Sequence, residues 1–218
     1  EKIPLDKEFY TPDDQHLISC WSINKTQAEL AWDISKGDSN IVVAIVEGAI
    51  QVTHEDLKNV LWINKDEIPN NNIDDDNNGY VDDINGWDIG DNDADVNPPN
   101  NSWTHGVHVA GIAGAETDNA IGIPSIGFGI SIMPIKSTQD ASGPGFVESG
   151  YDAIYYAALN NANVINCSWG GTNFSQTGQD VVNWAWNRGS IVVAASGNGD
   201  PLTGIGINID ITNLYPCN

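Results

Sequence analysis

Residues 41–46 read Ile-Val-Val-Ala-Ile-Val, a continuous apolar run rich in β-branched side chains. A run of this length and type is typical of a strand buried on both faces, as in a parallel sheet. Similar short runs follow at 130–135, 164–167 and 191–195. Segments with helical patterns lie between them, at 105–115, 146–160 and 180–188. Alternating strands and helices predict an α/β fold with three layers, a mostly parallel sheet flanked by helices.

The chain before the first strand has a less regular pattern. Residues 1–26 mix proline, polar and aromatic residues and are predicted to form an extended arm, whereas residues 25–33 have the pattern of a short helix. The length of 218 residues and the hydrophobic content of 40% favour a single domain over residues 1–218. The Asn- and Asp-rich stretch at about 64–102 is predicted to be a long acidic insertion in that domain.

The charge of the chain is strongly unbalanced. Thirty acidic residues against eight basic ones give a formal net charge of −22. Such a field repels phosphates and anionic lipid headgroups, so neither a nucleic acid nor a membrane is predicted as a partner. The three cysteines, Cys20, Cys167 and Cys217, allow at most one disulfide and form no Cys-x-x-C motif of a zinc or thioredoxin site.

The most acidic part of the insertion is the run from Asp74 to Asp83, Asp-Asp-Asp-Asn-Asn-Gly-Tyr-Val-Asp-Asp. With its first residue at position 1, oxygen donors fall at the spacing of an EF-hand calcium loop and Gly79 falls at the sharp turn. The predicted ligands are Asp74, Asp76, Asn78, Tyr80 through its carbonyl, and Asp82. Position 12 is Asn85 rather than the bidentate glutamate of an EF-hand. We predict that calcium binds here, because so many unneutralised carboxylates repel one another; the alternative is a solvated acidic loop.

Three segments carry residue types that acyl transfer requires. They are the strand end Val46-Glu47-Gly48, the segment Thr104-His105-Gly106-Val107-His108-Val109-Ala110-Gly111, and the segment Ala194-Ala195-Ser196-Gly197-Asn198. In this order they resemble the subtilisin-like serine proteases, in which an acid ends a core strand, a histidine opens a helix and an asparagine follows an Ala-rich strand. The arm segment Thr11-Pro12-Asp13-Asp14 is similar to the thermitase branch of that family. The resemblance extends over about residues 11–216 and implies a subtilisin-like α/β domain.

The resemblance also implies roles for individual residues. Glu47 is implied as the acid of the catalytic triad, His105 as the general base and Asn198 as the oxyanion donor. The implied substrate-binding residues lie in a Gly-rich segment and a Ser-x-Gly strand: Ser142, Gly143, Ser168, Trp169 and Gly170. A second calcium site is implied, with the side chains of Asp14, Asp56 and Asn119 and the carbonyls of Thr117, Ile121 and Ile123 as ligands. Taken singly, several of these residues also suit a structural role, and His108 is predicted to be structural.

Two departures from the family pattern affect the prediction. Glu47 stands where the family has Asp, and its extra methylene displaces the carboxylate; a displacement of ~1 Å in a catalytic array can cost ~10²-fold in rate. The family nucleophile lies in a Gly-Thr-Ser-x-Ala-x-Pro motif, and no Gly-Thr-Ser occurs in these residues. We therefore expect the chain to be the N-terminal two-thirds of a protease domain, with its C-terminal part missing. By itself the chain is expected to be inactive. The missing C-terminal part of the domain is expected to be its partner.

The leading prediction is a secreted, calcium-stabilised subtilisin-family serine endopeptidase that hydrolyses polypeptides. The alternative is a non-enzymatic, calcium-dependent binding module on a protease scaffold, which Glu47 and the missing serine favour. A nucleotide-binding protein has little support, because neither G-x-G-x-x-G nor a P-loop is present. An acid peptidase of the sedolisin type needs a Glu-x-x-x-Asp pair on a helix, whereas Glu47 ends a predicted strand.

Overall fold

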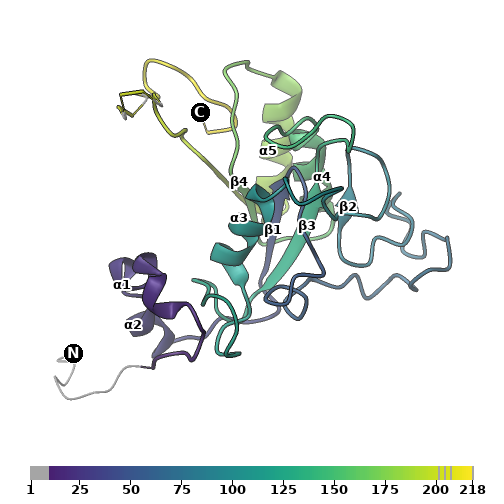
Figure 1. The fold of residues 1–218 in the computed structure, drawn as a ribbon. Helices are drawn as coiled ribbons and strands as arrows, with labels where there is room; N and C mark the ends of the chain where they lie inside the picture. The colour runs from purple at the N-terminus through teal and green to yellow at the C-terminus, as the bar shows by residue number, and fades with distance from the viewer. Residues whose placement is uncertain (1–9, 201, 204, 207, 218) are drawn as a thin grey trace.

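The structure of the chain is a computed structural model that describes residues 10–200, 202–203, 205–206 and 208–217. Within these residues one sheet contains β1 (Val42–Glu47), β2 (Trp87–Asp88), β3 (Ser131–Lys136), β4 (Val164–Cys167) and β5 (Ile191–Ala194). The helices are α1 (Trp21–Thr26), α2 (Ala28–Trp32), α3 (His105–Gly114), α4 (Gly150–Leu159) and α5 (Gln176–Asn187), with a 3₁₀ turn η1 (Leu17–Ser19) before α1. Figure 1 shows α1 and α2 set apart from the sheet and the long loops around β2 on its other side.

All paired strands are parallel, in the order β2-β3-β1-β4-β5. The chain leaves the central β1 to build β2 and β3 on one side, and then β4 and β5 on the other. The carboxyl ends of the strands therefore meet at one edge, and the change of side at β1 is the place where open α/β sheets bind ligands. Glu47 lies at this edge, in register with Lys136 of β3.

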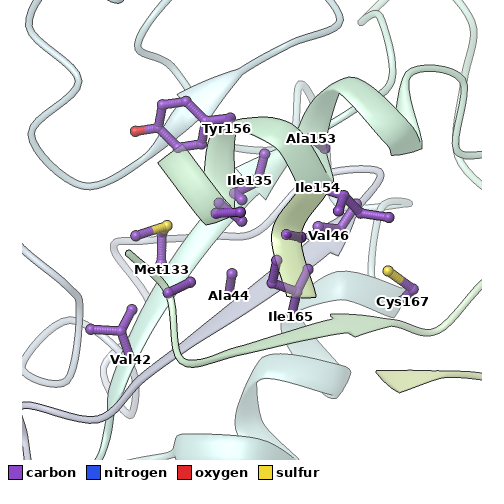
Figure 2. Packing of buried hydrophobic residues seen from close by; sticks show 14 of the residues in the cluster. Val42, Ala44, Val46, Met133, Ile135, Ala153, Ile154, Tyr156, Ile165 and Cys167 are labelled. Carbon is purple, nitrogen blue, oxygen red and sulfur yellow. The ribbon is translucent and has the colours of Figure 1, made fainter. Parts of the chain in front are cut away.

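Alternate residues of β1 face opposite sides of the sheet, as the pleat requires. Val42, Ala44 and Val46 belong to the larger apolar cluster, which includes α4 and part of α5 (Figure 2). Ile45 belongs to a second cluster that includes α3. Helices therefore cover both faces, and the predicted three-layer α/β fold with a parallel sheet is confirmed. Because Glu47 is two residues beyond Ile45, its side chain lies on the same face as α3.

The N-terminal segment differs from the predicted arm and helix. Residues 17–26 contain η1 and α1 rather than extended chain, and the predicted helix at 25–33 is divided between α1 and α2. The division falls at Gln27, whose φ of 56° and ψ of 40° are the left-handed conformation that ends a helix. Trp32 and Ile23 then pack in a small cluster of their own. The expectation of an extended arm was therefore wrong for residues 17–26, and residues 1–9 lie outside the described part.

Three other differences from the sequence prediction are larger than a shift of one residue. β2 lies inside the insertion, where no strand was predicted, because its two residues are extended only through pairing with β3. α4 begins at Gly150 rather than 146. α5 begins at Gln176 rather than 180, because the Ser175 hydroxyl accepts a hydrogen bond of 3.0 Å from the Gly178 amide and caps the helix. Among the described residues, no helix has the length and apolar character needed to cross a membrane.

Candidate active site

Glu47 and His105 meet at the carboxyl edge of the sheet. Glu47 is the last residue of β1 and His105 is the first of α3, and Oε2 of Glu47 lies 2.9 Å from Nδ1 of His105. The backbone of α3 comes close enough only because the next residue is Gly106: a Cβ there would lie 2.2 Å from the Ala49 carbonyl oxygen and 2.9 Å from Cβ of Glu47. The structure thus brings together the two residues that the sequence assigned to the acid and the base.

The two side chains of this pair differ in environment. Glu47 is 3% exposed, whereas the His105 side chain is 63% exposed. Burial raises the pKa of Glu47, against the hydrogen bond with His105 and the Gly48 amide, which lower it. Oε1 of Glu47 is buried and has no hydrogen-bond partner among the described residues. The buried carboxylate therefore fixes the imidazole through Nδ1 and leaves Nε2 available on the exposed side.

The backbone of Glu47 is fixed as firmly as its side chain. The amide and the hydroxyl of Ser137 both donate to the Glu47 carbonyl oxygen, at 2.9 Å and 2.7 Å. Ser137 directly follows β3 and is fully buried. The end of β3 therefore holds the end of β1, which lets the longer side chain of glutamate reach the imidazole from a defined backbone position.

A groove of about 660 Å³ opens beside this pair. Its walls include the predicted substrate-binding residues Ser168, Trp169 and Gly170. In the Gly-rich segment the lining starts at Pro144, so Ser142 and Gly143 lie just before the part that lines the groove. Asn198 is exposed in the loop after β5 and does not line it. The structure therefore gathers most, but not all, of the residues predicted for this site.

Several aromatic residues of the groove were missed by the sequence analysis: Trp103, Phe146, Tyr151 and Tyr215. Tyr215 reaches the groove because its backbone pairs with Gly171, through amide-to-carbonyl bonds of 3.0 Å and 2.8 Å. No local sequence pattern predicts a pairing between two residues more than forty positions apart. For Tyr151, its place at the start of a helix after a Gly-rich segment was the one available signal.

The comparisons with known proteins agree with this geometry. The profile described as the Subtilase family matches residues 38–217. The chain belongs to the subtilase family. Thermitase of Thermoactinomyces vulgaris is 39% identical over 190 residues, which cover 87% of this chain and 58% of that protein. A thermophilic serine proteinase of Bacillus sp. (strain AK1) is 37% identical over 195 residues, which cover 89% of this chain and 42% of that protein.

The solved structures support the same fold. A protease structure from Pseudoalteromonas arctica has a TM-score of 0.65 at 24% identity, covering 87% of this chain and 60% of that chain. At this identity the likeness shows the fold alone. The present subtilase chain spans roughly half the length of the two curated relatives, 42% and 58%.

The predicted family-type calcium ligands lie together beside α3. Asp14 is buried and its Oδ2 accepts the Asp118 amide at 2.9 Å. The Asp56 carboxylate accepts the Asn119 side-chain amide and the Ile123 backbone amide, each at 3.0 Å. Burial raises the pKa of Asp14, and the nearby charge of Asp56 raises it further. The loop that carries Thr117, Asn119, Ile121 and Ile123 is thus folded against both carboxylates.

One oxygen of this site stands out. Oδ1 of Asp14 is buried and has no hydrogen-bond partner among the described residues. Buried carboxylate oxygens are normally satisfied, and a hard cation with oxygen ligands would satisfy this one. The donor set, two carboxylates with amide and carbonyl oxygens, therefore suits Ca²⁺.

In the acidic run from Asp74 to Asp83, some carboxylates accept hydrogen bonds from backbone amides of the same loop. Asp74 accepts the backbone amides of Asn78 and Gly79, at 3.0 Å and 2.9 Å. Asp82 accepts the amides of residues 71 and 72, at 3.1 Å and 2.9 Å. These two carboxylates therefore hold the backbone of the loop. Tyr80 stacks edge-on against an aromatic neighbour, its ring centroid 4.8 Å from that of Tyr156.

The carboxylates that do converge are those of Glu67, Asp76 and Asp83, whose oxygens lie within 4.8 Å of one another. Asp83 is fully buried and accepts hydrogen bonds from Asn64, Asn78 and Tyr156. Burial raises the pKa of Asp83 to about 6, against these hydrogen bonds. Glu67 and Asp83 were not among the predicted ligands, because a linear EF-hand spacing does not show which side chains turn inward.

A buried cation links the acidic insertion to the end of the sheet. Lys136, the last residue of β3, is 1% exposed and contacts the carboxylates of Asp88, Asp91 and Asp140. The distances to Asp91 and Asp140 are 2.8 Å and 3.0 Å. Burial lowers the pKa of Lys136, but the bonds to the three carboxylates outweigh it and raise the pKa overall. Sequence analysis gave no sign of this cluster, which joins segments about fifty residues apart.

Proposed function

We propose that the protein containing this chain is a subtilisin-family serine endopeptidase in which Glu47 and His105 are the acid and the base. The observation that carries the proposal is the 2.9 Å contact between the Glu47 carboxylate and Nδ1 of His105, made beside a groove and on the strand edge where ligands bind. Membership of the subtilase family supplies the reaction class, hydrolysis of peptide bonds in polypeptides.

In the proposed reaction, Nε2 of His105 takes the proton of a serine hydroxyl as its oxygen attacks the substrate carbonyl carbon. The same nitrogen then gives the proton to the leaving amine as the C–N bond breaks. A water molecule, deprotonated by Nε2 in the same way, then hydrolyses the acyl-enzyme ester and restores the serine hydroxyl. The Glu47 carboxylate holds the required tautomer and stabilises the imidazolium. The side-chain amide of Asn198 is proposed to donate to the oxyanion. Extended substrate is proposed to lie along Ser142 and Gly143 on one side and Ser168, Trp169 and Gly170 on the other.

The nucleophile is the part of the machinery that these 218 residues do not supply, since they contain no Gly-Thr-Ser. Part of the sheet face that α3 packs on is uncovered: α3 covers β1 and β3, whereas Ile191 and Val193 of β5 remain about half exposed on that face. We propose that a further segment of the protein covers this face and brings the serine. These residues alone are then proposed to be inactive.

Calcium stabilisation and secretion are proposed from the family resemblance and the two groups of oxygen ligands. Oδ1 of Asp14, which is buried and has no hydrogen-bond partner in the described part of the chain, supports the family-type site. The convergence of Glu67, Asp76 and Asp83 supports a second cation at the insertion. The ligands proposed from the sequence, Asp74, Asp76, Asn78, Tyr80 and Asp82, share only Asp76 with that carboxylate group, so the second site is proposed around the group itself.

The test compares the 218-residue chain with the full-length product of its gene. A fluorophosphonate probe is expected to label one serine of the full-length protein and none of the chain alone. His105→Ala should abolish the labelling. Glu47→Asp, which shortens the side chain by one methylene, is expected to reduce peptide turnover by ~10²-fold, because the carboxylate withdraws from Nδ1. Specific labelling of the chain alone, or a full-length Glu47→Asp variant faster than the wild type, would contradict these assignments.

A second candidate function is a calcium-dependent binding module that has lost catalysis. Glu47 at the position of the family Asp favours it, as does the lack of a hydrogen-bond partner for its Oε1 among the described residues. A full-length protein that binds peptides, carries no probe-reactive serine and cleaves no peptide would establish this alternative.

A further inference from the structure

Trp169 forms one wall of the groove, and a glycine provides the space for its ring. Gly150 is the first residue of α4 and lines the same groove. A Cβ on Gly150 would lie 2.5 Å from Cζ2 and 2.6 Å from Cη2 of the Trp169 indole. Such distances are far below van der Waals contact, so the indole as placed and any larger residue at position 150 exclude each other.

A second ring and a second glycine support Trp169 from behind. The ring of Tyr151 meets the indole edge to face, with centroids 5.9 Å apart and planes at 88°. Behind Tyr151 lies Gly178 of α5, where a Cβ would be 2.5 Å from the Tyr151 Cζ. A side chain larger than glycine at either position would overlap with the ring that packs against it. The indole is therefore supported on the side that faces away from the groove, and it cannot move back when a ligand binds.

The remaining walls define the kind of side chain that the groove accepts. Trp103, Phe146 and Tyr215 contribute aromatic surface. Among the described residues no lysine or arginine lines the groove, while Glu47 and Glu148 do. Apolar substrate side chains are therefore favoured, and acidic ones meet carboxylates without a compensating cation.

We infer that Trp169 is a specificity-determining residue: its ring limits the depth of the groove, so that medium-sized aliphatic side chains are accepted in preference to aromatic ones. The inference rests on the proposed function, because it takes the groove to bind polypeptide. A mismatch of one methylene in an apolar pocket is worth ~10–200-fold in discrimination. Removing most of the indole opens more space than that and should invert the preference.

Binding of short peptides to the 218-residue chain tests this without requiring catalysis. The probes are acetylated, amidated alanine tetrapeptides in which one position at a time carries Val, Leu, Phe or Trp. Their dissociation constants are measured by NMR titration. The wild-type chain is expected to bind the best Leu peptide at least tenfold more tightly than its Phe counterpart. Trp169→Leu should reverse that order, whereas Trp186→Leu, at a 65% exposed position of α5 outside the groove, should leave it unchanged.

The Gly150→Ala variant tests the inference independently of Trp169→Leu. Its new methyl group should push the indole into the groove and weaken the Leu peptide about tenfold or more. The double variant Gly150→Ala/Trp169→Leu should recover binding, because the clash requires the indole. Circular dichroism checks the fold of each variant. Peptide binding with an unchanged Leu-to-Phe ratio in Trp169→Leu, or no recovery in the double variant, would overturn the inference alone. No binding of any peptide by the wild type would overturn the inference together with the proposed placement of substrate along this groove.

Discussion

The carboxyl edge of the sheet and the acidic insertion hold their carboxylates in opposite ways. At the edge, Glu47 is placed by regular elements: β1 pairs with β3 and β4, and Ser137 fixes the Glu47 carbonyl. In the insertion there is little regular structure, and the carboxylates themselves hold the chain. Glu67, for example, accepts the backbone amides of Asp75, Asp76 and Asp82. The position of the carboxylate at the edge therefore depends on the packing of the strands, whereas the path of the chain in the insertion depends on its charged carboxylates.

This difference makes the two regions sensitive to different changes. Removing a carboxylate at the edge alters the site and leaves the strands in place. Removing a cation or protonating a carboxylate in the insertion alters the loop itself, since the acids there repel one another when unneutralised. Lys136 belongs to both regions, because it ends β3 and neutralises Asp88 and Asp91 of the insertion.

The largest effect is expected from Lys136→Met, which breaks the link between the two regions. The Asp88 side chain is 2% exposed and would be left buried without its cation. Removing one partner of a buried ion pair typically costs ~3–5 kcal/mol. Urea unfolding followed by circular dichroism measures the loss in the free energy of unfolding.

Asp140 provides the matched control for this prediction. Its side chain also contacts Lys136 but is 57% exposed. Exposed pairs contribute ~0–1 kcal/mol, so Asp140→Asn should have a small effect. Equal losses in the free energy of unfolding for Asp140→Asn and Lys136→Met would show that burial does not determine how much each ion pair of this cluster contributes to stability.

The next largest effect is expected from calcium. A site saturated at ~100 times its dissociation constant adds ~2.7 kcal/mol, which for a chain of this size raises Tm by roughly 5–10 °C. Thermal unfolding in excess calcium and in chelator gives the comparison. Equal midpoints would mean that both groups of oxygen ligands are merely solvated.

Two variants then locate the calcium effect. Asp56→Asn removes a proposed ligand of the site next to α3, and Asp83→Asn removes a proposed ligand from the insertion. If both sites bind, each variant should lose part of the calcium-dependent rise in Tm. A rise that persists in Asp83→Asn and disappears in Asp56→Asn assigns the stabilisation to the family-type site, and the reverse assigns it to the insertion.

A smaller effect is expected from pH in chelator, through Asp83. Burial raises the pKa of Asp83 to about 6, while an aspartate in the unfolded chain titrates near ~3.9. Between these values the folded chain holds a proton that the unfolded chain has lost, so the contribution of Asp83 to stability falls as pH rises through about 6. The stability of the wild type relative to Asp83→Asn should therefore increase by ~2 kcal/mol from pH 7.5 to pH 4.5. A difference that does not change with pH would contradict the raised pKa.

Local patterns were enough to predict β1, β3, β4 and β5 and the presence of the helices that lie against them. The apolar run at 41–46 has a length and a composition that suit a strand covered on both faces, and it became β1. The motif around His105 carries its own helix start, and it became α3. The pattern could not predict β2, whose two residues have no signal of their own, nor the break at Gln27 between α1 and α2.

Residue types at fixed spacing along the chain were sufficient to predict the α/β class, the acid and base candidates and the family resemblance. Which distant side chains share a site follows from the fold. It placed Trp169 against Gly150 and Lys136 among its three aspartates. It also turned Glu67 and Asp83 inward while Asp74 and Asp82 hold the backbone. The physical reason is that burial and Coulomb interaction depend on distance in space, which for these residues follows from the order of the strands in the sheet and the path of the loops between them.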